Sequence, residues 1–307
     1  MDNSAEKQRQ KAVIRIDKAI AELPLLPSAV CNLMALSTND NKYFEKVYQY
    51  AEQDPTFALR IIKLANSAAS APREDLTSIK QAVIRIGSKQ IKNLATAFAV
   101  TKIFVPSNKS ERNLWLHAIQ LAVASQTIAG LAVEHPVDPE KAYLCGLLHD
   151  IGRFVLFSLV PDGPLKIDEK DWKTPDELIE AEQEAVGTDH AKLGAYAAKK
   201  WTLPSELANV ISNHHNYVYS LIPSVDKNEA ALIRIVQMAD FFSVLLMVNP
   251  DILFLPAKQQ EALIEKHCCH PAWGSPPIKA VLLQKQAQKI NDKALKTIAG
   301  LGINIDE

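Results

Sequence analysis

The chain has 307 residues, of which 48% are hydrophobic and 22% charged, and its formal net charge is −1. These values are typical of an ordinary globular protein with room for one large domain or two modest ones. No apolar run reaches about 18 residues and the N-terminus has no signal-peptide core, so we expect neither a membrane span nor a secretory leader. The cysteines Cys31, Cys145, Cys268 and Cys269 form no spaced framework, which predicts a cytoplasmic protein.

The N-terminal third of the chain predicts short helices separated by prolines and polar turns. An amphipathic pattern over residues 5–21 assigns an N-terminal helix to residues 1–22. Residues 23–105 predict a bundle of about five short helices. These helices are expected at 28–36, at 43–53, after Asp54-Pro55, from a Ser78/Gln81 capping box to Gly87, and roughly at 88–104.

The helices become longer after a linker at residues 105–110. They are expected at 113–133, at 140–151 after Asp138-Pro139, at 174–186 with a capping box, at 189–201, from Leu203-Pro204 to the Asn213–Asn216 end, at 227–248, at 257–267 and at 277–299. No strand-like alternation of any length appears. The sequence therefore predicts an all-α, multi-helix protein, with an N-terminal helical subdomain (23–105) packed on a larger helical domain (111–250) and C-terminal helices (251–307) packed on that domain.

Basic residues are concentrated in one segment of a nearly neutral chain. Residues 60–112 contain ten Lys and Arg against three acids, a net +7. These residues are either solvated helix faces or a docking face for an acidic signalling partner or a phosphate-bearing ligand, with Lys89 and Lys92 as its candidates. Nucleic acid is a weaker alternative, because aromatic residues are barely interleaved with the basic ones.

One stretch, Gly146-Leu147-Leu148-His149-Asp150-Ile151-Gly152-Arg153, places a His-Asp pair after an apolar helical run that we expect Gly152 to stop. An imidazole and a carboxylate are good ligands for Zn²⁺, Mn²⁺ or Fe²⁺. Asp240 lies in an apolar helix with no Lys or Arg three or four residues away, so its burial requires a metal, a His or a dense set of hydrogen bonds.

Taken singly, these residues have plain structural explanations. A lone His in a helix is more often a hydrogen-bonded core residue than a metal ligand, and a His pair at a helix end can simply favour the helix dipole. Taken together, seven residues have the right chemistry: His117, His149, Asp150, His190, His214, His215 and Asp240. Seven such ligands suit two divalent transition-metal ions bridged by a carboxylate, namely iron, manganese or zinc, with magnesium as the alternative, a layout suited to phosphoester hydrolysis.

Residues 23–216 resemble the HDOD domain, the HD-related output domain of bacterial signalling proteins. The resemblance rests on Leu25-Leu26-Pro27, Asp54-Pro55, Leu64-Ala65-Asn66-Ser67, Ser78-Ile79 with Ala82-Val83 and Gly87, the Gly146–Gly152 stretch, Asp189-His190 with Gly194, Trp201 and Leu203-Pro204, and His214-His215. Residues 113–248 also look like the wider HD superfamily of metal-dependent phosphohydrolases, which includes the HD-GYP phosphodiesterases of cyclic di-GMP.

The resemblance implies that the seven residues fall on metal-ligand positions, and that Arg153 falls where HD-GYP proteins carry a Lys near the substrate phosphate. Many HDOD proteins have lost part of this ligand set, whereas this chain keeps it. It lacks the Asp-Gly-x-Gly-Tyr-Pro segment after His214-His215, which argues against cyclic di-GMP hydrolysis. Asn113 stands where some trinuclear relatives place a Glu ligand, which favours two metals over three.

Two hypotheses follow. The first is a regulatory signalling module that acts through a partner or a nucleotide. The second is a working metal-dependent phosphohydrolase with Asp150 and Arg153 as catalytic residues. Two other features are given structural interpretations: His267-Cys268-Cys269-His270 as a helix end, because four contiguous residues cannot wrap one tetrahedral ion, and residues 180–184 as a solvated acidic helix face.

Overall fold

The structure, a computed structural model, describes residues 41–67, 78–159, 167, 170, 172 and 174–305. The helices expected at 5–21 and 28–36, and with them the predicted N-terminal helix of residues 1–22, lie outside the described residues. Within the described ranges every regular element is an α-helix or a short 3₁₀ helix, and there is no strand. The all-α prediction is confirmed for this part of the chain.

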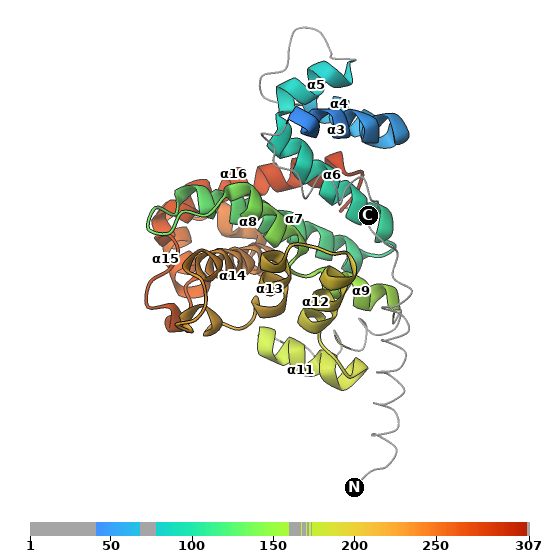
Figure 1. The fold of residues 1–307 in the computed structure, drawn as a ribbon. Helices are drawn as coiled ribbons and strands as arrows, with labels where there is room; N and C mark the ends of the chain where they lie inside the picture. Colours follow the sequence, from blue (N-terminus) through green and yellow to red (C-terminus); the bar gives the residue numbers. More distant parts are fainter. Residues whose placement is uncertain are drawn as a thin grey trace, which may run out of the picture.

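Four short helices form one end of the molecule (Figure 1). They are α3 (Asn41–Gln53), α4 (Pro55–Ser67), α5 (Ile79–Ile86) and α6 (Ser88–Ile103). Aromatic rings join α3, α4 and α6, since the centroid of Phe57 lies 4.7 Å from that of Tyr50 and 5.7 Å from that of Phe98. Asp54 caps α4 as expected, with Oδ1 accepting from the Thr56 amide at 3.1 Å.

The capping prediction for α5 is correct in position and wrong in detail. Ser78 occupies the N-cap position, but its side chain makes no capping hydrogen bond, so the expected Ser78/Gln81 box is absent. The predicted end is confirmed, because Gly87 has a φ of +84°, a value that side-chain-bearing residues rarely adopt.

The larger part of the molecule is built around two long helices. Its elements in chain order are α7 (Lys109–Leu131), α8 (Pro139–Leu148), α9 (Ile151–Leu159), α11 (Pro175–Val186), α12 (His190–Lys200), α13 (Ser205–Asn213), η1 (Tyr219–Leu221), α14 (Lys227–Val248), η2 (Pro250–Phe254), α15 (Ala257–Cys268), η3 (Pro271–Trp273) and α16 (Ala280–Gly300). Among the described helices, α7 and α14 are long and apolar enough to cross a membrane, yet 72% and 67% of their most apolar windows are buried inside the protein. Their apolar character is therefore accounted for by the core that they form.

The end of α8 differs from the prediction. We expected one helix over residues 140–151 stopped by Gly152, but α8 ends at Leu148, and α9 begins at Ile151 with Gly152 in its first turn. His149 and Asp150 thus occupy the turn between two helices. The reason for the glycine is packing rather than helix termination, because a Cβ at position 152 would lie 1.8 Å from the His190 carbonyl oxygen. Gly152 lets α9 and α12 approach closely.

The C-terminal helix connects the two ends of the molecule. Helix α16 packs along α7 and reaches α4, where Arg60 Nη1 donates to the Gly300 carbonyl at 2.7 Å. One continuous hydrophobic cluster extends from Tyr43 to Ile303. The subdomain boundaries at 105 and 250 stay predictions, although residues 104–108 do separate α6 from α7.

Candidate metal centre

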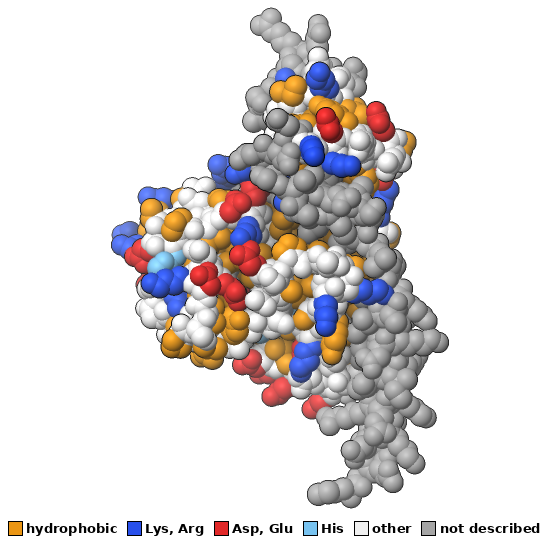
Figure 2. All heavy atoms as spheres, in the orientation of Figure 1, with side chains coloured by type: hydrophobic (Ala, Val, Ile, Leu, Met, Phe, Trp, Pro, Cys, Tyr) orange, Lys and Arg blue, Asp and Glu red, His pale blue; other side chains and the backbone are white. Residues whose placement is uncertain are grey.

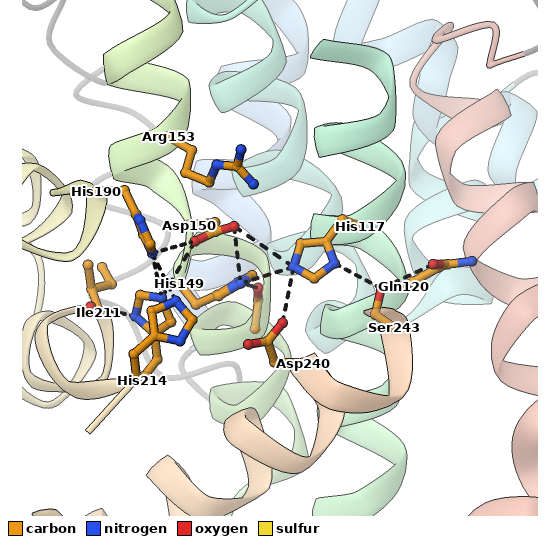
Figure 3. Close-up of polar contacts among 12 residues, drawn as sticks. His117, Gln120, His149, Asp150, Arg153, His190, Ile211, His214, Asp240 and Ser243 are labelled. Carbon is orange, nitrogen blue, oxygen red and sulfur yellow. Dashed lines mark hydrogen bonds and ion pairs between the residues drawn. The ribbon is translucent and has the colours of Figure 1, made fainter. Parts of the chain in front are cut away.

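The fold brings all seven candidate ligands together, and Figure 3 labels all of them except His215. His117 comes from α7, the His149-Asp150 pair from the turn between α8 and α9, and His190 from the first residue of α12. His214 and His215 follow α13, and Asp240 comes from α14. The ligand atoms form two groups, each with all atoms within 4.8 Å of one another. We call them the His190 group (Asp150, His190, His214, His215) and the His117 group (His117, His149, Asp240).

Asp150 lies between the two groups. Its Oδ1 is 3.3 Å from His190 Nε2 and 3.5 Å from His214 Nε2. Its Oδ2 faces the other group, 3.6 Å from His149 Nε2 and 3.8 Å from His117 Nε2. One carboxylate therefore offers one oxygen to each group, which is the arrangement of a bridging ligand in a two-metal site.

Asp240 is buried and needs a partner, as its sequence setting predicted. That partner is His117, whose Nε2 lies 3.3 Å from Asp240 Oδ1. Burial would raise the pKa of Asp240, but the hydrogen bond and charge of His117 outweigh it and lower the pKa below its usual value. In the same way the surrounding imidazoles, His149 first and then His190 and His214, overcome the burial of Asp150 and hold its pKa well below the usual range. Both carboxylates are thus kept ionised and able to bind cations.

Four of the five imidazoles are oriented by acceptors at Nδ1. His149 Nδ1 lies 2.8 Å from the Gly146 carbonyl oxygen, and His214 Nδ1 lies 2.7 Å from that of Ile211. His117 Nδ1 lies 3.0 Å from Ser243 Oγ, and His190 Nδ1 is 2.6 Å from a carboxylate. Each Nδ1 must donate its proton to an oxygen, so in the neutral ring the lone pair is on Nε2. The arrangement is typical of metal-binding histidines, whose second nitrogen is held by a hydrogen-bond acceptor.

The Nε2 atoms converge closely enough to test whether a metal fits. His117 and His149 approach to 3.3 Å, His190 and His214 to 3.1 Å, and His215 and His190 to 3.0 Å between Nε2 atoms. Neutral rings oriented in this way would point lone pairs at one another, an arrangement that a proton or a metal cation between them relieves. Among the described residues, Asp150 Oδ1 and His215 Nδ1 are also buried without a hydrogen-bond partner. The donor set and geometry fit two divalent cations.

Sequence reasoning missed the residue that holds His190. Glu182 on α11 is fully buried, and its Oε2 accepts from both the backbone amide of His190 at 2.9 Å and its Nδ1 at 2.6 Å. The interpretation of residues 180–184 as a solvated face is therefore wrong for Glu182, although Glu180 and Glu184 are exposed. A signal was present, because Glu182 lies four residues from Leu178 and Val186, on the apolar face of α11.

A second supporting chain was also missed. Ser243 Oγ donates to Gln120 Oε1 at 3.1 Å, and Gln120 Nε2 donates to Asn291 Oδ1 at 3.0 Å. Because the Ser243 hydroxyl proton is used in this way, its oxygen accepts from His117 Nδ1. The signal was spacing: Gln120 follows His117 by three residues and Ser243 follows Asp240 by three, each within an apolar helix.

The pKa values of two imidazoles move in opposite directions. Burial lowers the pKa of His149 to about 4, and the charge of Asp150 offsets only part of this shift. Burial also acts on His190, but the Glu182 carboxylate and then Asp150 outweigh it and raise the pKa to about 9. A positive charge at the centre is therefore most stable at the His190 position, beside two carboxylates.

Arg153 lies one helical turn beyond Asp150, beside the centre (Figure 3). Its Nε is 3.9 Å from Glu182 Oε1, and its guanidinium carbon lies 5.7 Å from the centre of the Trp172 ring. Arg153 is partly buried and belongs to neither ligand group. Its position next to Glu182 and Asp150 is compatible with the predicted role of holding a phosphate.

The two candidate partner-binding lysines have different surroundings. Lys89 on α6 is exposed, whereas Lys92 is half-buried. Burial lowers the pKa of Lys92, opposed by the charges of Asp138 and Glu140 at the start of α8. On the face shown in Figure 2, basic, acidic and apolar side chains are interspersed over the described surface.

The His267–His270 run ends a helix, as predicted. Helix α15 ends at Cys268, and His270 Nδ1 accepts from the amide of Ala272 at 3.2 Å. The His270 ring stacks on Tyr217 with centroids 4.3 Å apart. His270 is thus used for capping and packing.

Comparisons with known proteins identify the family and the fold of this chain. A family model described as the HDOD domain matches residues 23–217. A crystal structure of an HDOD domain protein of unknown function from Geobacter sulfurreducens superimposes with a TM-score of 0.68 and 23% identity, covering 96% of this chain and 98% of that one. A candidate phosphohydrolase from Shewanella amazonensis SB2B gives 0.67 and 23%, covering 94% and 98%. At these identities the structural likeness establishes the fold alone.

Two further relatives are longer than this chain. A protein from Marinobacter aquaeolei VT8 assigned to signal transduction superimposes with a TM-score of 0.63 and 18% identity, covering 96% of this chain and 66% of that one. An uncharacterized protein of Treponema pallidum (strain Nichols) is 26% identical over 213 residues, which are 69% of this chain and 41% of that protein. The chain thus spans less than half the length of this relative.

Proposed function

The chain belongs to the HDOD domain family, and from this premise we propose that it is a signalling module built around a binuclear metal centre. The centre would hold two divalent transition-metal ions, one in each ligand group, with Asp150 shared between them. The module would act on a signalling partner or bind a nucleotide, and the state of the centre would bias the conformation that it presents. A bacterial cytoplasm is the setting that we propose for it.

One observation carries this proposal: the seven ligands form two compact groups joined by one carboxylate. A structural core of histidines would not require four of the imidazoles to be oriented with Nε2 facing inward. Nor would it place an ionised, buried Asp150 between the groups, since an uncompensated buried carboxylate costs several kcal/mol. Divalent cations account for both features, because they take neutral imidazoles and carboxylates as ligands.

Elemental analysis of protein purified without chelators tests the metal proposal. We expect about two transition-metal ions per chain in the wild type and almost none in Asp150→Ala, because both ions lose a ligand. His267→Ala is the matched control: this histidine is exposed on α15, outside both groups, and its loss should leave the metal content unchanged. A wild type that carries no transition metal and takes up none at micromolar concentration would contradict the proposal.

A second candidate function, metal-dependent phosphohydrolysis, is favoured by the completeness of the ligand set and by the position of Arg153. Two bound divalent ions would supply Lewis acidity toward a phosphoryl oxygen and would make a water more acidic. Asp150 would bind both ions and keep them next to each other. Arg153, one turn further along α9, would bind and orient the phosphate. Glu182 would keep both His190 and Arg153 in place, since it contacts each.

Hydrolysis of bis(p-nitrophenyl) phosphate by metal-loaded protein separates the two functions. In the catalytic case Asp150→Ala abolishes turnover while circular dichroism shows an intact helical fold, and Arg153→Ala raises KM more than Arg153→Lys does. Turnover that Asp150→Ala leaves unchanged would contradict the catalytic role. Metal binding with no turnover in the wild type would leave the signalling module as the function.

For the signalling role, Lys89 is the better of the two lysines for a test. Charge reversal at Lys89 changes an exposed side chain, whereas reversal at Lys92 would also replace its electrostatic attraction to Asp138 and Glu140 with repulsion. We expect Lys89→Glu to weaken binding of an acidic partner at unchanged metal content. A partner affinity that is unaffected by Lys89→Glu would exclude this face.

A further inference from the structure

A polar cavity lies outside the metal centre, against the N-terminal half of α14. Its volume is about 270 Å³. It is bounded by the segment after α7, by η1, by α14 and by the segment after η3. The polar side chains of its lining are Glu134, His135, Ser220, Lys227, Arg234 and Ser275. None of them belongs to either ligand group.

One face of α14 forms the wall of this cavity. Lys227, Ala230, Ala231 and Arg234 all line it, and their spacing places them on one side of the helix over two turns. The two alanines leave room in the middle of the wall, and a cationic side chain stands at each end. The wall therefore carries one positive charge at each end, with only the small alanine side chains between them.

The guanidinium of Arg234 is held in place by its neighbour across the cavity. Arg234 Nε donates to Ser220 Oγ at 2.9 Å, and Ser220 is 8% exposed. This bond fixes the plane of the guanidinium. Its terminal nitrogens have no hydrogen-bond partner among the described residues, so they remain available as donors. The Ser220 hydroxyl proton likewise has no acceptor among the described residues.

Acidic residues near the start of α14 are directed elsewhere. Glu229 Oε1 accepts from Asn209 and Tyr219, at 3.2 and 3.0 Å. Asp226 caps the helix by accepting from the amides of Asn228 and Glu229. Among the described residues that line the cavity Glu134 is the only acid, and it is exposed. Glu229 and Asp226 therefore form no ion pair with Lys227 or Arg234.

We propose that this cavity is an anion-binding site for a small phosphate monoester. The two cations, Arg234 held by Ser220 and the exposed Lys227, match the two negative charges of a phosphate monoester. The guanidinium edge and the serine hydroxyls match its oxygens, and the volume suits one phosphate with a small organic group. The site is close to the metal centre along the chain: Arg234 precedes Asp240 by six residues on α14, and Ser220 follows His215 by five. Gln237, between Arg234 and Asp240 on α14, donates to the Asn216 carbonyl at 3.2 Å.

Calorimetric titration of the full chain, depleted of metal by chelation, tests the site without contribution from bound ions. Ribose 5-phosphate is the probe and ribose its uncharged counterpart. We expect ribose 5-phosphate to bind, inorganic phosphate to compete, and ribose to give no signal. Asp150→Ala should bind the probe as well as the wild type does, so this result is independent of whether the metal proposal holds.

Two variants assign binding to the cavity. Lys227→Gln removes an exposed charge and should weaken binding about fivefold, as expected for a partly exposed ion pair. Arg234→Gln should weaken it about tenfold or more, because it removes charge-assisted hydrogen bonds. Lys285→Gln, at an exposed position of α16, is the control and should have no effect. The proposal is overturned if ribose 5-phosphate binds no better than ribose, or if Lys227→Gln and Arg234→Gln bind it as the wild type does.

Discussion

The two ligand groups of the metal centre differ in what holds their histidines. In the His190 group, His190 is held by a fully buried carboxylate, Glu182. In the His117 group, His117 is held by a neutral chain that runs through Ser243 to Gln120. Apart from the shared Asp150, the carboxylate of the His117 group is one of the ligands themselves, Asp240.

The difference means that the two ions should respond to different changes. A carboxylate that accepts the Nδ1 proton strengthens imidazole as a donor and fixes its orientation, so affinity in the His190 group depends on a charge outside the ligand set. Affinity in the His117 group depends on neutral hydrogen bonds, which contribute less. Asp150 is shared by both groups, so the two ions would be neighbours. The side chains that hold the histidines of each group are nevertheless different.

The largest effect is expected from a substitution that separates α9 from α12, because it would displace His190 from its group. A Cβ at position 152 would overlap the His190 carbonyl oxygen and approach the Gly194 amide at 2.6 Å, so Gly152→Ala must displace α12 and with it His190. We expect a loss of about 3 kcal/mol or more in the free energy of unfolding. Urea unfolding followed by circular dichroism measures it.

The chain supplies a matched control for that substitution. Gly130 lies in α7, is exposed, and has no atom within 4 Å of a built Cβ. Gly130→Ala should therefore be neutral or stabilising by up to about 1 kcal/mol, because alanine favours the helix. Equal stability of the Gly152→Ala and Gly130→Ala proteins would show that close packing at Gly152 is unimportant.

The next prediction addresses the His190 group alone. Glu182→Gln keeps the shape of the side chain and an oxygen for the His190 amide, but it removes the charge beside the His190 ring. We expect the affinity for one of the two ions to fall about 10- to 100-fold, with the other ion little changed. Metal titration with a competing chelator would show one weakened binding step.

Glu180→Gln, two residues away on the exposed side of α11, is the control and should leave both binding steps unchanged. Equal weakening of both steps by Glu182→Gln would mean that the groups are not independently supported. No weakening of either step would mean that the orientation of His190 does not depend on Glu182.

The chemistry of the ligands was predictable from the sequence, whereas for the residues that support them the sequence indicates the helix face but not the partner. Asp240 stood out because an unpaired carboxylate in an apolar helix requires an explanation wherever the helix packs. The spacing of Glu182 from Leu178 and Val186 places it on the apolar face of α11, but only the packing of α11 against α12 shows that its partner is His190. Local spacing gives the face of a helix but not its neighbour.

The fold was predictable to a similar extent. The bounds of α14, Lys227–Val248, agree with the prediction, because a polar cap and a long apolar run define both ends. The break at His149-Asp150 was not foreseen, since Gly152 was interpreted as a local stop signal. Its actual role depends on a backbone oxygen of His190, 38 positions further along the chain, and no local pattern contains that information.

The smallest expected effect falls on the His117 group. Ser243→Ala leaves the His117 Nδ1 proton without its acceptor and Gln120 Oε1 without its donor, both in a buried setting. A lost neutral hydrogen bond of this kind contributes about 1 kcal/mol, so we expect roughly a fivefold loss of affinity for a single ion. In Ser243→Ala the step left intact should be the one that Glu182→Gln weakens.

Ser110→Ala, at an exposed position near the start of α7, controls for the loss of a hydroxyl as such. The double variant Glu182→Gln/Ser243→Ala then sharpens the comparison. If the two groups are supported separately, each binding step of the double variant should lose as much metal affinity as it does in the corresponding single variant. The altered side chains share no hydrogen-bond partner, so their effects should be additive. If both substitutions weaken the same step, Glu182 and Ser243 do not support separate ions, and the proposed difference between the two groups is wrong.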